Sequence, residues 1–384
     1  MKTVIAIDSF KGSLSSKQAG DAVREAVLAL EPDSEATVIP IADGGEGTYE
    51  AITLARGGSI VKKSVIGPLG VRITASFGVI EKDGVKTAII EMAEASGITL
   101  VPPHLRNPLN TTTFGTGELI KHAIVDIGCR DFIIGIGGSA TNDGGLGMLS
   151  ALGFAFLDKE GRRVADFGRG LRDLREIRTE VALPELSECR FRIACDVKNP
   201  LCGERGCSRI YGPQKGADEK IITDMDAWLE SYAELTREIY PHADKDAEGA
   251  GAAGGLGFAF LSYLGGSLCS GIELVIEATG LAEAVHGADL VITGEGRLDG
   301  QSCMGKAPVG VAACAKAEGI PVIAFSGAVT PDAHLVNNHG IDAFFPILRA
   351  PCTLEEAMNS ENAYSNLYNT ATQALRLFRI SHKR

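Results

Sequence analysis

Short apolar runs that lead directly into acidic or glycine-rich segments are the feature that most constrains the fold of this chain. Residues 3–7 form a continuous apolar run, which is typical of a strand buried on both faces of a parallel sheet. Ser15 and Gln18 then form a capping box before a helix with one apolar face. Residues 37–42 repeat the strand signal, and a second helix is expected to end near Gly57. The start of the chain is therefore predicted as βαβα.

The same alternation of strands and helices returns only near the end of the chain. A helix is predicted to begin at Pro308 and to stop at Gly319, because proline in the first turn and glycine after the last one are favoured. A closing helix is expected from Leu354 onward. Strands are predicted around these helices at residues 288–293, 321–325 and 342–348.

The middle of the chain has a different pattern. Residues 73–77 and 86–91 flank a Lys-Asp-Gly turn, which indicates a hairpin rather than a crossover. Two further strands are predicted at 132–136 and 191–195, and a long helix at 224–239. We therefore expect a discontinuous α/β domain built from both ends of the chain, interrupted by a mixed second domain.

The net charge and the cysteine content limit the expected classes of binding partner and the expected cellular compartment. The 384 residues include 49 acidic and 37 basic ones, so the net charge of −12 repels nucleic acid and anionic lipid. The nine cysteines contain no Cys-x-x-Cys pair, and the apolar run at 3–7 is too short for a signal peptide. A cytoplasmic protein with reduced thiols is expected, while the oligomeric state is left open.

One uncharged stretch, residues 249–272, is long enough to span a bilayer. Its glycines cluster at both ends around residues 256–264. We therefore interpret it as a glycine loop that leads into a short buried helix, and no membrane partner is expected.

Three predicted strands of the terminal domain end in segments suited to ligand binding. These segments begin at Asp8, Asp43 and Gly294. In open parallel sheets, ligands bind beyond the carboxyl ends of the strands. Carboxylates beside glycines and cations are the mixture that holds magnesium and orients an anion.

The second domain offers three further candidate segments. Residues 135–145 follow a predicted strand and could cradle phosphate oxygens, although a ligand-free glycine turn has the same composition. Asp196 follows another strand and is a candidate base, with Lys198 and Asn199 beside it. Arg209 and Lys215 could clamp an anionic group or pair with surface acids.

Two nucleotide motifs fail on inspection. Residues 300–307 match a Walker A loop except at Ala307, where a hydroxyl is required, so only Lys306 is kept as a phosphate contact. Residues 249–254 fit a dinucleotide pattern but follow a charged segment instead of a strand. Two functions stay open at this point, a nicotinamide-dependent hydroxy-acid oxidoreductase, with its pyrophosphate at Gly135, and a ligand-binding protein without turnover.

Read together, these segments resemble the bacterial type-1 glycerate kinases along essentially the whole chain. The resemblance rests on seven blocks in one order, at residues 7–11, 42–48, 113–119, 136–145, 194–200, 211–216 and 292–299. It implies ATP-dependent phosphorylation of D-glycerate with magnesium in the cytoplasm, with 2-phosphoglycerate as the expected product. It also implies a flavodoxin-like domain from residues 1–67 and 287–384 and an inserted α/β domain at 68–286.

Roles for individual side chains follow from that chemistry, because a kinase must position two anions and neutralise their charge. The expected ATP contacts are Gly137, Gly138, Ser139, Asn142 and Lys306, and the expected magnesium ligands are Asp43, Glu295 and Asp299. The expected substrate contacts are Asp8, Asn199, Lys215 and Arg297. Lys11 and Arg297 are expected to grip the glycerate carboxylate, and Asp196 to orient or deprotonate the attacking hydroxyl. Hinge closure around bound substrate is expected near residues 68 and 286.

Overall fold

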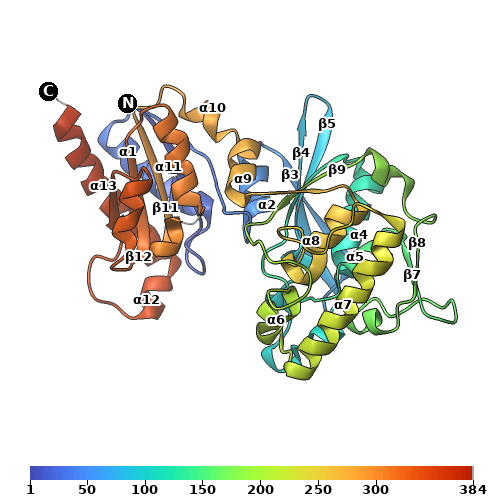
Figure 1. The fold of residues 1–384 in the computed structure, drawn as a ribbon. Helices are drawn as coiled ribbons and strands as arrows, with labels where there is room; N and C mark the ends of the chain where they lie inside the picture. Colours follow the sequence, from blue (N-terminus) through green and yellow to red (C-terminus); the bar gives the residue numbers. More distant parts are fainter. Residues whose placement is uncertain (304, 383–384) are drawn as a thin grey trace. The chain divides into compact units, whose positions relative to one another are not determined.

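The computed structural model describes residues 1–303 and 305–382 and divides into two compact units (Figure 1). Unit 1 comprises residues 1–43, 50–56 and 272–384, so it contains both ends of the chain. Unit 2 comprises residues 44–49 and 57–271. Each unit has its own sheet.

Unit 1 is built on a five-stranded parallel sheet in the order β13-β12-β11-β1-β2. Counted within the unit, this order is 2-1-3-4-5, the flavodoxin-like arrangement. The predicted fold class, an α/β protein with a flavodoxin-like parallel sheet, is confirmed. The strands are β1 (Lys2–Ile7), β2 (Glu35–Val38), β11 (Leu290–Leu298), β12 (Val322–Val329) and β13 (Ala343–Pro346).

Helices cover both faces of this sheet. Helices α1 and α13 lie on one side, where they share an apolar core with the strands, and α11 lies on the other (Figure 1). Ser15 caps α1 through the predicted capping box with Gln18, and the buried residues of the helix lie on its apolar face. The helices are α1 (Ser16–Leu30), α2 (Thr48–Ala55), α9 (Gly271–Thr279), α10 (Leu281–Val285), α11 (Ala307–Ala317), α12 (Leu354–Met358) and α13 (Ser360–His382).

Two strand predictions in unit 1 were wrong at their ends. Strand β2 stops at Val38 instead of continuing to residue 42, because Pro40 has no N–H to donate to a sheet. Strand β11 continues to Leu298, whereas a loop was predicted from Gly294 onward. Its added residues pair with β12, including Arg297 opposite Ala328, and this tertiary pairing keeps a glycine-rich segment extended.

Unit 2 contains a six-stranded mixed sheet in the order β10-β9-β6-β5-β4-β3. The predicted hairpin is present as antiparallel β4 and β5, while β5, β6, β9 and β10 run parallel. Strand β3, which the predicted domain boundary assigned to the terminal domain, pairs with β4 in this sheet. The strands are β3 (Ser59–Ile66), β4 (Arg72–Lys82), β5 (Val85–Glu91), β6 (Asp131–Gly135), β9 (Arg190–Ala194) and β10 (Ser267–Cys269).

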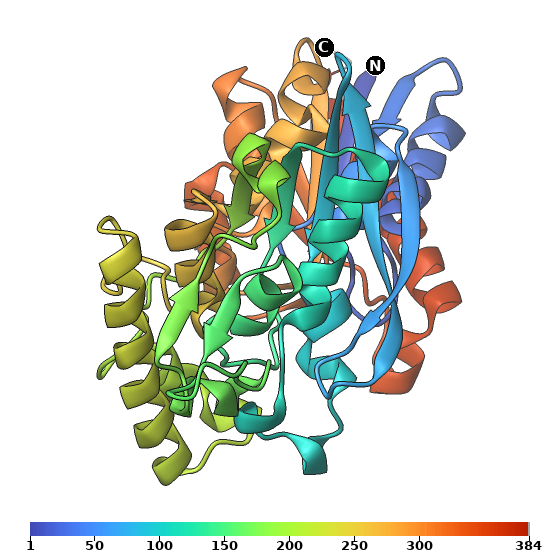
Figure 2. The ribbon, with the colours of Figure 1, turned by 90° about the vertical axis from the view of Figure 1, so that its right-hand side faces the viewer.

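The helices of unit 2 share one apolar core with this sheet, and the longest of them, α7, is the yellow-green helix in Figure 2. A small two-stranded ribbon of β7 (Ala155–Leu157) and β8 (Glu176–Arg178) completes the unit. The helices are α3 (Ala93–Ser96), α4 (Phe114–His122), α5 (Leu146–Ala151), α6 (Cys207–Tyr211), α7 (Glu219–Ile239) and α8 (Ala252–Tyr263).

The uncharged stretch forms a glycine loop and the buried helix α8, as predicted. Within residues 1–303 and 305–382, no helix combines the length and apolarity that a membrane crossing requires. The glycines permit close backbone contact: a Cβ on Gly254, where φ is +69°, would lie 2.1 Å from the carbonyl oxygen of Thr141. This loop therefore supports residues 141–144, which accounts for its glycines without a dinucleotide.

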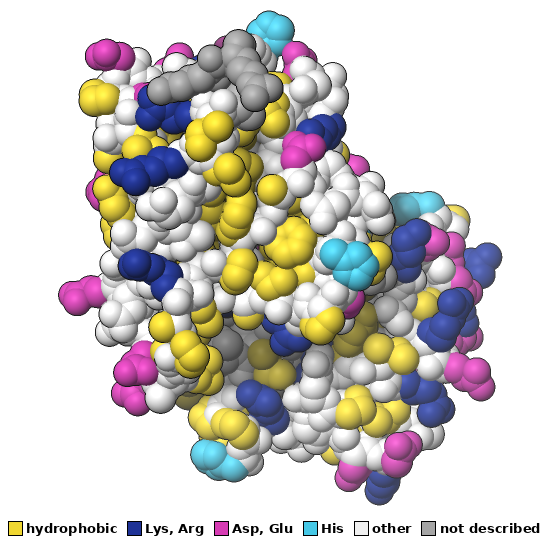
Figure 3. Space-filling view, turned by 90° about the vertical axis from the view of Figure 1, so that its left-hand side faces the viewer, with side chains coloured by type: hydrophobic (Ala, Val, Ile, Leu, Met, Phe, Trp, Pro, Cys, Tyr) yellow, Lys and Arg dark blue, Asp and Glu magenta, His cyan; other side chains and the backbone are white. Residues whose placement is uncertain are grey.

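On the face of unit 1 seen in Figure 3, apolar side chains gather along the middle, and charged side chains of both signs lie around them. Exposed apolar residues of α12 and α13 include Leu354, Leu377 and Ile380. All nine cysteines belong to the described part of the chain, and each is a free thiol there.

Candidate active site

In unit 1, two of the predicted ligand-binding segments lie side by side at the carboxyl ends of β1 and β11. Asp8 follows β1 and is only 4% exposed, and its backbone N–H donates to the carbonyl of Gly294 at 2.9 Å. Gly296 makes room for the next residues, because a Cβ there would lie 3.3 Å from the Cα of Phe10. The exposed Lys11 therefore adjoins the end of β11, as the rule for parallel sheets predicts.

Carboxylates are crowded at this edge of the sheet. Burial raises the pKa of Asp8 to about 7, and the charges of Asp43 and Glu295 act in the same direction, whereas the N–H of Ser9 and the charge of Lys11 oppose the rise. Burial likewise raises the pKa of Glu295, although Ser302 Oγ donates to it at 2.5 Å and Lys306 Nζ lies 4.0 Å away. Asp8, Asp43 and Glu295 thus form one interacting group of acids.

The other charged residues of this edge are placed at the end of β11 and the start of α11. Arg297 is exposed, and its Nε lies 3.4 Å from Asp299 Oδ2. Lys306 is the N-cap of α11, whose first turn receives no side-chain cap. The unsatisfied N–H groups of such a turn favour an anion. Met304, in the segment that resembles a Walker A loop, lies outside the described residues.

In unit 2, glycine-rich segments meet at the carboxyl ends of β5 and β6. Gly137 and Gly138 are exposed just after β6, and Gly138 has a φ of +72°. Residues 44–45 approach this turn closely, since a Cβ on Gly135 would lie 2.7 Å from the carbonyl oxygen of Gly44. The backbone of residues 137–139 is therefore accessible, as a phosphate cradle requires.

Glu91 is a residue of this edge that the sequence analysis did not single out. It ends β5, is buried, and accepts the N–H of Tyr49 at 2.9 Å, together with those of Gly47 and Thr48. Burial raises its pKa to about 7 despite these bonds. The signal that the sequence offered for Glu91 was an acidic residue at the end of an apolar strand. In the structure, this residue holds the segment 47–49.

Asn142 and Asp143 lie beneath the glycine turn. Asp143 is fully buried and accepts the backbone N–H groups of Gly145 and Gly147, so the amino terminus of α5 is already capped. Asp143 thus occupies two N–H groups at the end of the segment that was expected to cradle phosphate oxygens. Asn142 is also buried and donates to Ser208 Oγ at 2.9 Å.

Lys215 is placed under the same turn, although a substrate clamp was expected of it. The side chain is 2% exposed, and its Nζ donates to Ser139 Oγ at 2.8 Å and to the carbonyl of Thr141 at 2.6 Å. Burial lowers the pKa of Lys215 to about 8. The lysine thus links the segment after α6 to the glycine turn after β6.

Asp196 and Asn199 follow β9 in unit 2. Asp196 is exposed, and its carboxylate accepts the N–H of Gly271 at 3.0 Å. Asn199 accepts the hydroxyl of Tyr211 at 2.7 Å and donates to the carbonyl of Arg205 at 2.9 Å. Asp196 therefore has the accessibility that a contact with substrate needs, while Asn199 is held by neighbouring residues.

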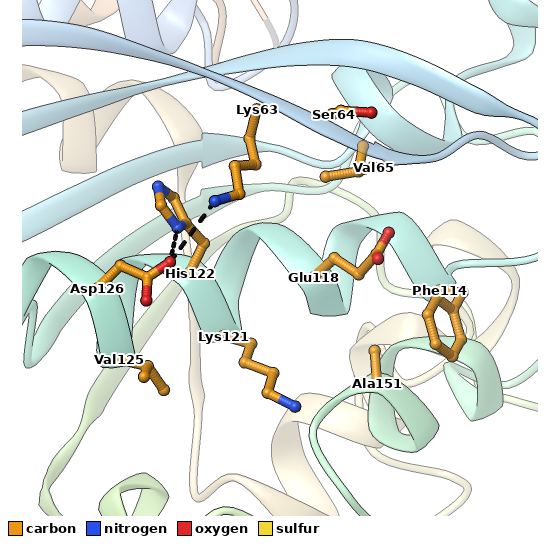
Figure 4. A pocket seen from close by; sticks show the side chains of 10 residues that line it. All are labelled: Lys63, Ser64, Val65, Phe114, Glu118, Lys121, His122, Val125, Asp126 and Ala151. Carbon is orange, nitrogen blue, oxygen red and sulfur yellow. Dashed lines mark hydrogen bonds and ion pairs between the residues drawn. The ribbon is translucent and has the colours of Figure 1, made fainter.

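A separate cavity of about 320 Å³ lies between β3 and α4 in unit 2 (Figure 4). His122 and Lys63 both bind Asp126 there, Lys63 at 3.6 Å. Glu118 of the same wall accepts the N–H of Ile66 at 2.6 Å. None of the predicted site residues lines this cavity, so we give it no part in the reaction.

The structure therefore brings the predicted residues together in separate groups. In unit 1, Asp8, Lys11, Asp43 and Glu295 interact at one sheet edge, with Lys306 beside Glu295 and Arg297 beside Asp299. In unit 2, Lys215 joins Ser139 of the glycine turn. A doubly wound sheet with acidic strand ends in unit 1 and an accessible glycine turn in unit 2 are features of the α/β class, whose members commonly bind phosphate compounds at such positions.

The comparisons with known proteins specify the family. The model of the glycerate kinase family matches residues 3–379, and the chain belongs to this family. It is 49% identical over 368 residues to "Glycerate 2-kinase" of Escherichia coli (strain K12), covering 96% of this chain and 95% of that protein. It is 45% identical over 364 residues to "Glycerate kinase" of Bacillus subtilis (strain 168), covering 95% and 94%.

A crystal structure described as a "putative glycerate kinase 2" from Salmonella typhimurium LT2 covers 100% of both chains, with a TM-score of 0.91 and 44% identity. The resemblance inferred from the seven sequence blocks is therefore confirmed, and the fold with it. The alternative of a nicotinamide-dependent oxidoreductase is not supported by these relatives.

Proposed function

We propose that this kinase transfers the γ-phosphoryl group of ATP to the 2-hydroxyl of D-glycerate, giving 2-phospho-D-glycerate and ADP. The observation that carries the proposal is the 49% identity over 96% of this chain to a protein named glycerate 2-kinase. We place the reaction in the cytoplasm, where ATP is available and free thiols such as those of this chain persist.

The glycine turn of unit 2 and the start of α11 in unit 1 are each proposed to bind a phosphate group. The exposed backbone of Gly137 and Gly138 and the Ser139 hydroxyl offer donors to phosphate oxygens. Lys306 and the uncapped first turn of α11 offer a second anion-binding group. The expected contribution of Asn142 to ATP binding stays a prediction. Because Asn142 is buried, we propose that it acts through the turn above it.

The acids of unit 1 fit a magnesium ion. Burial raises the pKa of Asp8, and the charges of Asp43 and Glu295 add to this rise, a repulsion that a divalent cation would relieve. In the part of the chain that the structure describes, no three ligating side chains are gathered around one point. This suits magnesium, which is commonly held by one or two carboxylates together with substrate phosphates. Asp43 and Glu295 are the proposed ligands, with Asp299 nearby, and the ion would neutralise phosphate charge.

Glycerate is assigned to cations that remain accessible. Lys11 and Arg297 are exposed at the edge of the unit 1 sheet, where they can bind a carboxylate. We propose that Asp8 and Asn199 contact the substrate hydroxyls and that Asp196 orients the attacking one. An exposed carboxylate at a strand end can accept that proton, a role worth on the order of 10²–10⁴ in rate.

The test is identification of the product by NMR after incubation of the purified chain with D-glycerate, ATP and magnesium. A phosphorus resonance coupled to the proton on carbon 2 is expected, with ADP formed in equal amount. Coupling to the carbon 3 protons would overturn the assignment to the 2-hydroxyl. Absence of ADP formation with D-glycerate would overturn the kinase reaction, and L-glycerate and EDTA samples test stereospecificity and the requirement for magnesium.

A further inference from the structure

Lys215 and Ser139 form a buried contact that the proposed reaction does not yet use. Lys215 ends a short 3-10 turn, Pro213–Lys215, and its ammonium donates to Ser139 Oγ at 2.8 Å across 76 residues of sequence. It donates also to the carbonyl of Thr141 at 2.6 Å. The ammonium thus fixes both sides of the turn that follows the exposed glycines.

The direction of this hydrogen bond determines what Ser139 can do. A lysine ammonium has donors and no acceptor, so Ser139 Oγ must accept, and the hydroxyl proton of Ser139 is left to donate elsewhere. Among the described residues, no other group bonds to Ser139 Oγ. Ser139 is half-buried and directly follows the exposed Gly137 and Gly138. Its hydroxyl is therefore a donor held ready for a ligand acceptor.

We propose that Lys215 is a positioning residue of the phosphate cradle, which acts by directing the Ser139 hydroxyl toward a phosphate oxygen of the nucleotide. This inference rests on the proposed function and departs from the substrate contact expected of Lys215, since the buried ammonium acts through Ser139. A phosphate oxygen then accepts from the Ser139 hydroxyl and from the backbone N–H groups of the turn. The positive charge behind the turn adds to the attraction, because it lies in a poorly solvated interior.

The charged and titratable groups around Lys215 give this arrangement a pH limit. Burial lowers the pKa of the Lys215 ammonium to about 8, and the titratable groups that face it are Cys207 of α6 and the buried Asp143. Burial raises the pKa of the Cys207 thiol to about 12, and this group stays neutral in the range of interest. The Lys215 ammonium therefore loses its charge above about pH 8, and nucleotide binding should weaken there.

The experiment combines Ser139→Ala, Lys215→Met and the double variant, with Lys220→Met as the matched control. Lys220 is exposed on α7, only five residues from Lys215, and lies outside the proposed site. Binding of the non-hydrolysable nucleotide AMP-PNP with magnesium is measured by calorimetry between pH 6.5 and 9.5. KM values for ATP and glycerate and kcat are measured over the same range.

We expect Ser139→Ala to weaken AMP-PNP binding on the order of 10- to 100-fold, the effect of one hydrogen bond to a charged group. Lys215→Met should weaken it similarly, and the double variant should be no worse than Lys215→Met, because the two residues act as one unit. The weakening of binding above about pH 8 should be smaller in Ser139→Ala than in the unsubstituted protein, and Lys220→Met should leave all values unchanged.

Additive effects of the two substitutions on AMP-PNP binding would overturn the inference. The inference would also be overturned if AMP-PNP binding weakened above about pH 8 as much in Ser139→Ala as in the unsubstituted protein. This readout remains available if Lys215→Met does not fold. A rise in KM for glycerate alone in Lys215→Met would restore the direct substrate contact and overturn the positioning role. If AMP-PNP binds with the expected relations among the variants but D-glycerate is not turned over, the proposed function is rejected and the phosphate cradle is retained. Absence of AMP-PNP binding would reject both.

Discussion

Replacement of Asp143 should lower the stability of unit 2 by an amount that depends on which of its oxygens is kept. The buried carboxylate accepts four hydrogen bonds. Oδ2 accepts the N–H and the hydroxyl of Thr113, each at 2.8 Å, and the N–H of Gly147 at 3.3 Å. Oδ1 accepts the N–H of Gly145 at 3.1 Å. Oδ2 therefore accepts three hydrogen bonds and Oδ1 accepts one, and the amide variant tests this difference.

In Asp143→Asn, the amide oxygen can keep the three bonds of Oδ2, while the amide nitrogen faces the Gly145 N–H donor. One unsatisfied buried donor costs about 1–3 kcal/mol, so we expect a loss of about 2 kcal/mol. Asp143→Ala removes all four acceptor contacts but also removes a carboxylate that is costly to bury. We therefore expect a loss of about 3–5 kcal/mol, which is less than the sum of four separate penalties.

Urea unfolding followed by fluorescence measures these losses in unit 2. Trp228 is the single tryptophan of the chain and packs against the core of unit 2 from α7. Asp173→Asn is the matched control, because Asp173 is exposed and pairs with Arg172 at 3.0 Å on the surface. That control should remain within about 0.5 kcal/mol of the unsubstituted protein. Equal losses in Asp143→Asn and Asp143→Ala, or losses no greater than that of the control, would refute the reasoning.

Two further predictions concern Glu91 and Asp196. Folding raises the pKa of Glu91 from 4.5 to about 7, so its contribution to stability is complete below pH 4.5 and is lost as the pH rises through 7. The stability difference between the unsubstituted protein and Glu91→Gln, measured by Trp228 fluorescence, should therefore change by about 3 kcal/mol over this range, and a constant difference would contradict it. Asp196→Asn should lower kcat by on the order of 10²-fold or more with little change in AMP-PNP affinity, and equal losses in both would remove Asp196 from the proposed role.

The local pattern of the sequence was sufficient for most elements of the fold. The apolar run of β1, the capping box of α1 and the Lys-Asp-Gly turn between β4 and β5 each express a preference of a few neighbouring residues. Such preferences are satisfied in the structure because the tertiary packing agrees with them. The acidic segments at Asp8 and Asp43 and the exposed glycines at 137–138 were visible for the same reason, since each directly follows a strand or apolar run.

Tertiary structure alone decided where several of these residues ended up. The pairing of β11 with β12 extends the strand through Arg297, and the contact between Lys215 and Ser139 joins positions 76 residues apart. Glu91 and Asp143 became buried acceptors because backbone N–H groups from other segments converge on them. Burial and hydrogen-bond partners are properties of the folded neighbourhood and not of a residue type or its spacing. The sequence alone therefore determined the family, the elements and the segments that carry polar groups, whereas the fold decided which of those groups face solvent and which support the others.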